Sequence, residues 1–510
     1  MDMSKGVGPM SVEISCQDFK DRFLFEECNE DLPTVRIKRI VIDNFKSVTH
    51  GEIVLNCGKQ FVPYGTKSDI LGVYGQNGSG KTSLIEALSI LDRLLNGASV
   101  PDIYADCIAV GSDAAQLLFV FELQFENGEV REVSYGFSMA KVPLTQEEID
   151  DRYKDAPADY PIPDEVHRVR VFDEVLRMDR KNTDNKMIMQ DIINTSTKSV
   201  PFGPSTKLGE FVKKERKTLF ALEMAKKTAA DNSRSFIFSK KTLEIFKDSG
   251  LYSVYLQTIL ELRYYATLFL YVIDTKSSGL IRLNFSLPLF TRTGLLQLDV
   301  RRSNTFTNDA LPIVESDIKR VSDVLGQLVP GLSIGFKKIA DTLTKSGENA
   351  SIVMLVANRN GKELPLRDES DGIRKIISIL SLLIATYNDQ SFTLAVDEFD
   401  AGVFEYLLGE ILQILEESGK GQFIFTSHNL RPLEVIDKKF LVFTTTNPNN
   451  RYYRLKNIGN SNNLRDSYFR EIILGEQDEE IYSKTKKYRI VAALRKAGKE
   501  EWEENAPDEK

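Results

Sequence analysis

Three carboxylates follow an apolar run in the stretch "LAVDEFDAGVF", residues 394–404. Asp397, Glu398 and Asp400 lie close together, so a positively charged partner is expected beside them. A nuclease metal site, half of a nucleotide site and the solvated start of a helix all fit these residues alone. The partner of the carboxylates must therefore be sought elsewhere in the chain.

A second stretch with residues suited to chemistry is "LGVYGQNGSGKTSLIEALSIL", residues 71–91. It matches the pattern G-x-x-x-x-G-K-[ST] in full, with an apolar strand before the loop and an amphipathic helix after it. The glycines allow backbone N–H groups to approach phosphates, and the helix N-terminus adds the positive end of its dipole. We therefore expect nucleotide binding by Gly75, Gln76, Asn77, Gly78, Ser79, Gly80, Lys81, Thr82 and Ser83.

The two stretches together predict ATP hydrolysis with Mg²⁺ as cofactor. Lys81 is expected to reach the β- and γ-phosphates, and the Thr82 hydroxyl is expected to bind the metal. Asp397 then completes the magnesium site. Its neighbour Glu398 is placed to polarise the attacking water. Asp400 is left outside the chemistry and becomes a candidate for a contact between protomers.

Two further stretches carry polar residues at the ends of elements. "GQFIFTSHNL", residues 421–430, predicts a strand that ends in Ser-His-Asn, with His428 placed to contact a γ-phosphate. In "LRDESDGIRKIISILSLL", residues 366–383, Ser370 and Gly372 are expected to open a helix. The Ser370 hydroxyl and the free N–H groups there form an anion site, which need not serve the nucleotide bound by the same chain.

Taken in order, "GQNGSGKTS", "ESDGIRK", "VDEFDAG" and "FTSHN" resemble the ABC-type ATPases of the SMC-like branch. The resemblance implies a P-loop, a signature helix, an acidic strand with a D-loop, and a switch histidine. Such ATPases enclose two ATP molecules between two heads. Ser370 and Gly372 would accordingly contact the γ-phosphate held by another protomer.

The opening "IKRIVIDNFKSVTHGEIVL", residues 37–55, is similar to the first strand of the same branch. That similarity implies that Phe45, Lys46 and Ser47 lie near the nucleotide, with Lys46 in contact with it. The branch also has a Q-loop glutamine some forty residues beyond the P-loop. Gln124, in "FELQFENGEV", is the nearest candidate and is predicted as a further magnesium ligand.

Three positions depart from the pattern of the SMC-like branch. Glu369 stands where the signature usually has leucine, and Asp371 stands where it has its first glycine. Phe404 occupies the position at which the D-loop often ends in aspartate.

"DEFDAGVFEYLLGEIL" and "LRDSYFREIILGEQDEE" resemble a narrower set, the bacterial stand-alone "AAA family" ATPases of anti-phage systems such as PARIS and Septu, which are allied to the OLD family. The combined resemblance covers residues 36–136 and 280–475.

The expected fold class is α/β: a P-loop NTPase with an ABC-type ATPase head, in which a mixed sheet and a side antiparallel sheet accompany an inserted, mainly helical lobe. "AQLLFVFELQFENGEVREVSYGFSM" predicts two strands around the turn "ENGE", and residues 205–275 are predicted to be helical. We divide the chain into a weakly ordered extension (1–35), the N-terminal part of the head (36–200), a helical insertion for assembly or partner contact (201–279), the C-terminal part of the head (280–475), and a C-terminal helix with a polar tail (476–510).

Composition restricts the functional classes. The 510 residues are 42% hydrophobic and 27% charged, as in ordinary soluble proteins. The four cysteines contain no CxxC pair, which argues against a zinc knuckle and favours a reducing cytoplasm. The longest apolar stretch, of about twelve residues, is too short to cross a bilayer. A cytoplasmic protein without a membrane partner is expected.

Three functions fit these observations. The first is an ATP-driven switch that pairs with itself, as a dimer of heads or a higher homo-oligomer, and controls a separately encoded effector such as a nuclease. The second is a self-contained OLD-like nuclease, which would need a further acidic cluster after the head. The third is a DNA-maintenance ATPase of the SMC or RecF kind, although a net charge of −8 does not favour general binding to DNA.

Overall fold

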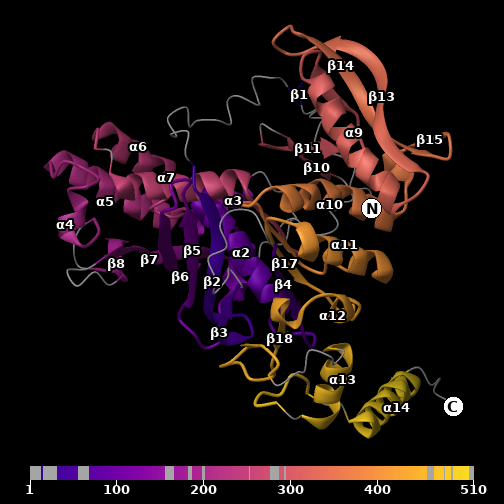
Figure 1. The fold of residues 1–510 in the computed structure, drawn as a ribbon. Coiled ribbons are helices and arrows are strands. Elements are labelled where there is room, and N and C mark those ends of the chain that lie inside the picture. Colours follow the sequence, from indigo (N-terminus) through magenta and orange to yellow (C-terminus); the bar gives the residue numbers. More distant parts are fainter. Residues whose placement is uncertain are drawn as a thin grey trace, which may run out of the picture.

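The computed structural model describes residues 13–14, 32–55, 68–154, 166–181, 187–197, 201–251, 253–275, 286–291, 294–456, 464–475, 477–483 and 486–504. Most of the expected N-terminal extension (1–35) and the end of the polar tail therefore lie outside the described residues. Figure 1 gives the element labels used below.

The central sheet holds the elements on which the motifs lie. Its strand order is β19 (Tyr452–Tyr453), β18 (Leu441–Thr444), β4 (Asp69–Tyr74), β17 (Gln422–Thr426), β16 (Thr393–Val396) and β9 (Leu270–Ile273). All pairs are parallel except β18 with β19. Every residue of β4, β16, β17 and β18 is buried, as expected for a parallel sheet covered on both faces. The carboxyl ends of β4, β17 and β16 therefore meet at one edge.

A second, antiparallel sheet lies beside the first. Its order is β3 (Val48–Val54), β2 (Thr34–Phe45), β5 (Ala115–Gln124), β6 (Val130–Pro143), β7 (His167–Lys181) and β8 (Met187–Asn194). The predicted pair of strands around the turn "ENGE" is confirmed by β5 and β6. The side chain of Gln422 joins the two sheets, because its amide accepts from the backbone N–H of Ile37 and donates to the Ile37 carbonyl, both at 2.8 Å.

Helix α2 (Lys81–Leu95) packs between the two sheets, against β9, β16 and β17 on one side and β2 on the other. Most of its side chains are buried, including Leu84, Leu88 and Leu91. A short 3-10 helix, η1 (Asp102–Cys107), follows it and packs against β6 and β7. The helix that begins at the Gly-rich loop is thus held rigidly on both sides.

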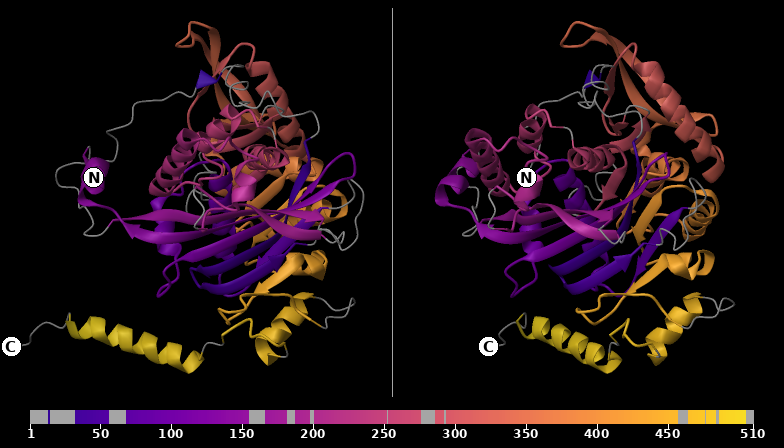
Figure 2. Two further views of the ribbon diagram at one scale, coloured as in Figure 1. Left: turned by 90° about the vertical axis from the view of Figure 1, so that its left-hand side faces the viewer. Right: turned by 60° about the vertical axis from the view of Figure 1, so that its left-hand side comes forward.

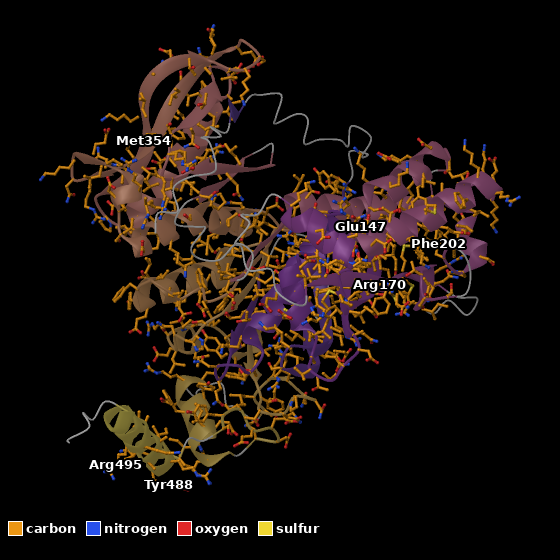
Figure 3. The ribbon with its side chains drawn as sticks, turned by 180° about the vertical axis from the view of Figure 1, so that it is seen from behind. Glu147, Arg170, Phe202, Met354, Tyr488 and Arg495 are labelled. Atoms are coloured by element: carbon orange, nitrogen blue, oxygen red, sulfur yellow. The ribbon has the colours of Figure 1, made fainter. Side chains whose placement is uncertain are left out.

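The expected helical segment is present as α4 (Ser205–Leu208), α5 (Arg216–Asp231), α6 (Lys240–Asp248) and α7 (Val254–Leu268). These helices lie over the side sheet, with α3 (Gln146–Tyr153) nearby, and Phe202 belongs to their aromatic core (Figures 2 and 3). The prediction of helix up to residue 275 is wrong for residues 270–273. These residues form β9, because parallel pairing with β16 completes the edge of the central sheet.

Two further sheets, one of two strands and one of five, form the arm together with one long helix, residues 286–365, at the top of Figure 1. It contains β10 (Ser286–Thr291), β11 (Gly294–Asp299), β12 (Asn304–Thr307), α9 (Leu311–Leu328), β13 (Leu332–Leu343), β14 (Asn349–Arg359) and β15 (Lys362–Pro365). The short strand β1 (Glu13–Ile14) pairs in parallel with β12. The arm has its own core, which continues into the next helix through Ile376 and Leu380.

That next helix is α10 (Asp371–Asn388), which follows the short η2 (Leu366–Asp368). Together with α11 (Glu405–Ser418) and α12 (Pro432–Val435), α10 packs against the face of the central sheet away from α2. After η3 (Lys438–Phe440), the chain ends with α13 (Leu464–Leu474) and α14 (Lys487–Glu504), which bears Tyr488 and Arg495 in Figure 3. Among the described helices, none is long and apolar enough to cross a membrane.

Candidate functional site

The Gly-rich loop between β4 and α2 has a backbone that only glycine adopts easily. Gly75, Gly78 and Gly80 have φ angles of 149°, 76° and 97°. These conformations disfavour side chains, and a Cβ on Gly75 would come within 1.8 Å of the Thr444 hydroxyl. A Cβ on Gly78 would meet nothing within 4 Å. The loop is thus tightly packed at its base and open at its tip, which leaves room for phosphates.

Residues from the C-terminal part of the chain hold this loop in shape. The Ser79 hydroxyl is hydrogen-bonded to the Thr444 hydroxyl and donates to the carbonyl of Gln76. The Tyr452 hydroxyl donates to the Gly80 carbonyl at 2.8 Å, and the Ser483 N–H donates to the Gln76 side chain at 3.0 Å. The sequence motif alone does not indicate these supports, which lie more than 350 residues away.

Lys81 supplies a positive charge inside the loop. Its ammonium group donates to the carbonyls of Gly75 and Gln76 at 2.8 and 3.0 Å. Burial lowers the pKa of Lys81, while the carboxylates of Asp397, Glu398 and Asp400 act in the opposite direction. An ammonium held at a Gly-rich loop and a helix N-terminus fits the binding of a phosphate chain.

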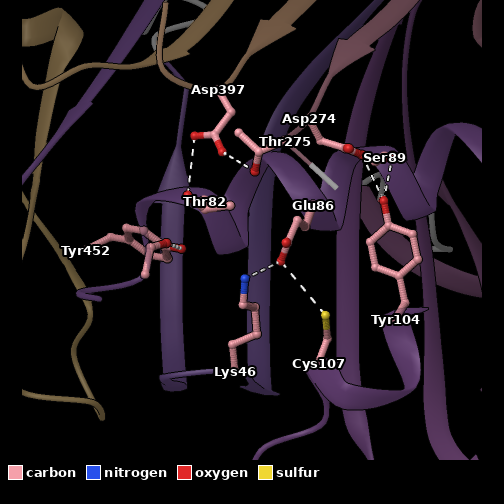
Figure 4. A network of polar contacts seen from close by, with 11 residues as sticks. Lys46, Thr82, Glu86, Ser89, Tyr104, Cys107, Asp274, Thr275, Asp397 and Tyr452 are labelled. Carbon is pink, nitrogen blue, oxygen red and sulfur yellow. Dashed lines mark hydrogen bonds and ion pairs between the residues drawn. The ribbon is translucent and has the colours of Figure 1, made fainter. Parts of the chain in front are cut away.

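The structure brings the acidic strand end to this loop. The Thr82 hydroxyl lies 3.4 Å from Asp397 Oδ1, although the two residues are 315 positions apart in sequence (Figure 4). Asp397 is 1% exposed, and it also accepts hydrogen bonds from the hydroxyls of Thr426 (2.5 Å) and Thr275 (3.2 Å). One buried carboxylate surrounded by hydroxyls fits Mg²⁺, which takes oxygen ligands and draws others from substrate phosphates.

Glu398 differs from its neighbour in both conformation and exposure. Its side chain is exposed, and its φ of 50° lies in the left-handed region that a non-glycine residue seldom adopts. The Thr426 hydroxyl accepts a hydrogen bond from its N–H at 2.8 Å. The chain therefore turns sharply after Asp397, with one carboxylate buried for a metal and the next one open to water. We call residues 397–402 the acidic turn.

Asp400 has a role within its own chain. Its Oδ2 atom accepts hydrogen bonds from the backbone N–H groups of His428 and Asn429, at 3.1 and 2.9 Å. Asp400 therefore fixes the loop that carries the exposed His428 side chain at the end of β17. The protomer contact expected for Asp400 stays a prediction, and these hydrogen bonds give its carboxylate a role within its own chain.

The start of α10 lies against the acidic turn. Ser370 caps the helix by accepting from the N–H of Ile373 at 3.4 Å, and its side chain is exposed. A Cβ on Gly372 would come within 2.5 Å of the Gly402 carbonyl, so only glycine permits this approach. Ser370 and Gly372 thus belong to the same edge of the molecule as the acidic turn.

Lys375, one turn further along α10, was not identified from the sequence. It is 4% exposed, and its ammonium group donates to the carbonyls of Glu398 (3.0 Å), Phe399 (3.2 Å) and Ala401 (2.5 Å). Burial lowers the pKa of Lys375 to about 8, against the opposing effect of Asp400 and Glu398. The lysine therefore ties α10 to the acidic turn.

Lys46 is paired with a carboxylate of α2. Its ammonium lies 2.7 Å from the carboxylate of Glu86, which is fully buried on α2 (Figure 4). The backbone next to it is linked to the loop, since Arg451 donates to the Ser47 carbonyl and its side chain packs against Gly80. Contact between Lys46 and a nucleotide stays a prediction, and the ion pair gives the side chain a structural role.

Gln124 as a magnesium ligand is contradicted by the structure. Strand β5 runs antiparallel to β2, so Gln124 pairs with Thr34 at the start of β2. That start lies beside the amino ends of the central strands, where Arg36 contacts the carbonyls of Gln390 and Lys420. The loop and Asp397 lie at the opposite, carboxyl ends of the central strands. Because the twelve residues of β2 span about 35 Å at about 3.3 Å per residue, Gln124 is too far away to reach a metal bound there.

A missed polar pair occupies the strand end next to Asp397. Asp274 and Thr275 directly follow strand β9. The Thr275 hydroxyl reaches Asp397, and Asp274 accepts from the Tyr104 hydroxyl at 2.8 Å (Figure 4). The apolar run "LFLYVI" before these two residues is the signal that could have revealed a third strand end at the site.

Comparisons with known proteins were made for the whole chain. A family profile described as "AAA ATPase domain" matches residues 36–431. A comparison with curated proteins gave no match. Among solved structures, the chain is similar to an Smc head bound to the C-winged helix domain of ScpA, with 15% identity, a TM-score of 0.38, and coverage of 82% of this chain and 98% of that one.

Two other solved structures are similar to a comparable degree. The SMC head domain from Thermotoga maritima is 14% identical, with a TM-score of 0.34 and coverage of 83% of this chain and 100% of that one. The recombination mediator protein RecF is 12% identical, with a TM-score of 0.32 and coverage of 79% and 95%. At these TM-scores the residue roles in this chain must be argued from its own geometry.

Proposed function

The chain belongs to the AAA ATPase domain family and has a P-loop ATPase fold, and on this premise we propose that it binds ATP and hydrolyses it to ADP and phosphate. The observation that carries the proposal is the contact between Thr82 and Asp397. It joins the phosphate-binding loop to the acidic turn. ATP hydrolysis needs groups from both, because neither the loop nor the turn alone carries a phosphate-binding lysine, a metal ligand and a base.

The residues have distinct roles in the proposed reaction. Lys81 and the loop N–H groups hold the β- and γ-phosphates, and Thr82 with Asp397 would hold Mg²⁺. Bound there, the metal would neutralise charge on the phosphate oxygens. Glu398 accepts the proton of the water that attacks the γ-phosphorus, the bond to the β-phosphate oxygen breaks, and ADP leaves with the electron pair. His428, at the end of β17, contacts the γ-phosphate.

We further propose that two heads pair around two ATP molecules. Ser370 and Gly372 are then the groups that contact the γ-phosphate bound by the other protomer. Two observations support this arrangement. The capped start of α10 is exposed beside the acidic turn, and Phe404, which follows that turn after Val403, is 71% exposed. An exposed phenylalanine next to an anion-binding helix start is a suitable anchor for a second copy.

The biological role proposed for the ATPase is a cytoplasmic switch in anti-phage defence, which senses or controls a separately encoded effector such as a nuclease. Its support is the sequence resemblance around "DEFDAGVFEYLLGEIL" and the tail. A DNA-maintenance role is the alternative. Salt-sensitive binding of DNA by the ATP-bound protein, with no effect of a co-encoded effector, would favour that alternative.

The test of the ATPase proposal compares three variants of the full chain. Glu398→Gln should bind ATP with unchanged affinity but lose at least about 100-fold in phosphate release, since a general base contributes roughly 10²- to 10⁴-fold. It should also accumulate as an ATP-dependent dimer in light scattering. Lys81→Ala should lose ATP binding itself.

Glu410→Gln is the matched control, because Glu410 is an exposed glutamate on α11 outside the acidic turn. It should behave as the unmodified protein in all three assays. Phosphate release by Glu398→Gln at the rate of the control would disprove the role of Glu398. Undiminished affinity in Lys81→Ala would disprove the nucleotide site.

A further inference from the structure

Helix α10, which carries Ser370, and the acidic turn, which carries Glu398, are in direct contact within one chain. Gly372 touches the Gly402 carbonyl, and the Lys375 ammonium holds the carbonyls of Glu398, Phe399 and Ala401. The five steps from Ser370 to Lys375 rise about 7.5 Å along the helix. The cap of α10 and the backbone of Glu398 are therefore joined through less than two helical turns.

The chemistry of the Lys375 contacts suits the control of a turn. An ammonium group has three donors, and here each meets a carbonyl oxygen of consecutive or nearly consecutive residues. Those carbonyls converge only when the chain bends sharply, as it does at Glu398 with its φ of 50°. Such a left-handed residue persists only where its surroundings hold it. Besides Lys375, the Thr426 hydroxyl holds Glu398 through its N–H.

We propose that Lys375 is a positioning residue that holds Glu398 in the orientation needed for hydrolysis and links it to Ser370 on the same helix. This inference rests on the proposed function. In a pair of heads, Ser370 contacts the nucleotide of the partner, whereas Glu398 acts on the nucleotide of its own chain. Lys375 then lies between the group that contacts one nucleotide and the carboxylate that polarises the water attacking the other.

Substitution of Lys375 separates positioning from simple structural support. In Lys375→Met, affinity for ATP should change by less than about threefold, while kcat should fall by 10- to 100-fold, because a misplacement of about 1 Å can reduce the rate by about 10². Lys375→Arg retains the charge and several donors, so it should keep most of the activity that Lys375→Met loses. An unchanged kcat in Lys375→Met would overturn the proposal.

Lys226→Met is the matched control for the loss of a lysine that binds backbone carbonyls. Lys226 lies on α5, and its ammonium donates to the carbonyls of Thr195 and Pro201, at 2.7 and 3.1 Å, away from the site. Both methionine variants should lose thermal stability, but only Lys375→Met should lose kcat. A fall in kcat of equal size in the control would assign the effect of Lys375 to stability.

Mixed assemblies test on which site Lys375 acts. In a pair of Lys81→Ala and Lys375→Met heads, the one remaining nucleotide site uses Glu398 of the Lys375→Met head, so no activity should return. In a pair of Lys81→Ala and Ser370→Arg heads, the remaining site uses Ser370 of the Lys81→Ala head, so activity should return. Recovery in the first mixture would overturn the inference, whereas no recovery in the second would overturn the shared sites and hence the proposed pairing.

Discussion

The ion pair between Lys46 and Glu86 allows a quantitative prediction about the base of the site. Glu86 is 0% exposed and Lys46 is 30% exposed, with 2.7 Å between the ammonium and the carboxylate. Removing one partner of a buried pair leaves the other charge uncompensated and destabilises a protein by about 3–5 kcal/mol. Because Lys46 is partly exposed, we expect Lys46→Met to lower the free energy of unfolding by about 2–3 kcal/mol.

The control is a pair of similar length in a different environment. The Lys38 ammonium lies 2.6 Å from Glu132 on the side sheet, with both side chains about one-third exposed, at 37% and 34%. Exposed pairs contribute less than about 1 kcal/mol, so Lys38→Met should change the free energy of unfolding only slightly. This holds although the two ion pairs have nearly the same distance between their charged groups. Burial is thus predicted to decide the outcome.

The assay is urea denaturation at equilibrium, followed by titration with ATP. Equal losses of stability in Lys46→Met and Lys38→Met would refute the reasoning from burial. A large loss of ATP affinity in Lys46→Met, with stability unchanged, would instead show that Lys46 serves the nucleotide, as the resemblance implies. The double variant Lys46→Met with Glu86→Leu should recover most of the stability, because it removes both buried charges.

Two further predictions concern other parts of the chain. Burial raises the pKa of Glu261 on α7 from 4.5 to about 7, with Arg131 opposing the effect. The folded protein then retains a proton that the unfolded chain releases, so stability falls as the pH rises from about 4.5 through about 7. Glu261→Gln should therefore be more stable, relative to the unmodified protein, at pH 8 than at pH 5. In urea denaturation this difference in the free energy of unfolding should grow by about 2 kcal/mol between the two pH values. A difference that is independent of pH would contradict this. Phe404→Ser places a favourable cap at the start of α11 and removes the proposed apolar anchor. In the Glu398→Gln background it should weaken ATP-dependent dimerisation roughly tenfold by light scattering, as the burial of most of a phenylalanine predicts, whereas Ile414→Ser, further along the same helix, should leave the dimer intact.

The success of the sequence predictions depended on whether the chemistry is local. The phosphate-binding loop is recognisable because contiguous residues determine both its backbone and its charge. The acidic turn was predicted to meet this loop because an apolar strand that ends in carboxylates has few other uses beside a P-loop. The contact between Thr82 and Asp397 confirms that they meet.

The misses arose where strand direction or pairing decides position. Gln124 was assigned from its spacing after the loop, but an antiparallel strand carries it to the far end of β2. The residues of β9 are compatible with the end of a helix, and only their pairing with β16 reveals that Thr275 belongs to the site. Lys375 resembles any lysine near the start of a helix until the fold places three carbonyl groups around its ammonium.

The three carboxylates that follow β16 have three different environments, and those environments determine what each can do. Hydroxyl groups surround Asp397, which fits a metal ligand; solvent surrounds Glu398, which fits a base that must exchange protons; and backbone N–H groups bind Asp400, which fits an anchor for the loop of His428. Because Lys375 holds the backbone of the same turn, a shift of α10 would move all three carboxylates together. A single displacement at the start of α10 would thus alter metal binding, proton transfer and the loop of His428 at once, and in the proposed pair of heads this would restrict hydrolysis of ATP to the closed state.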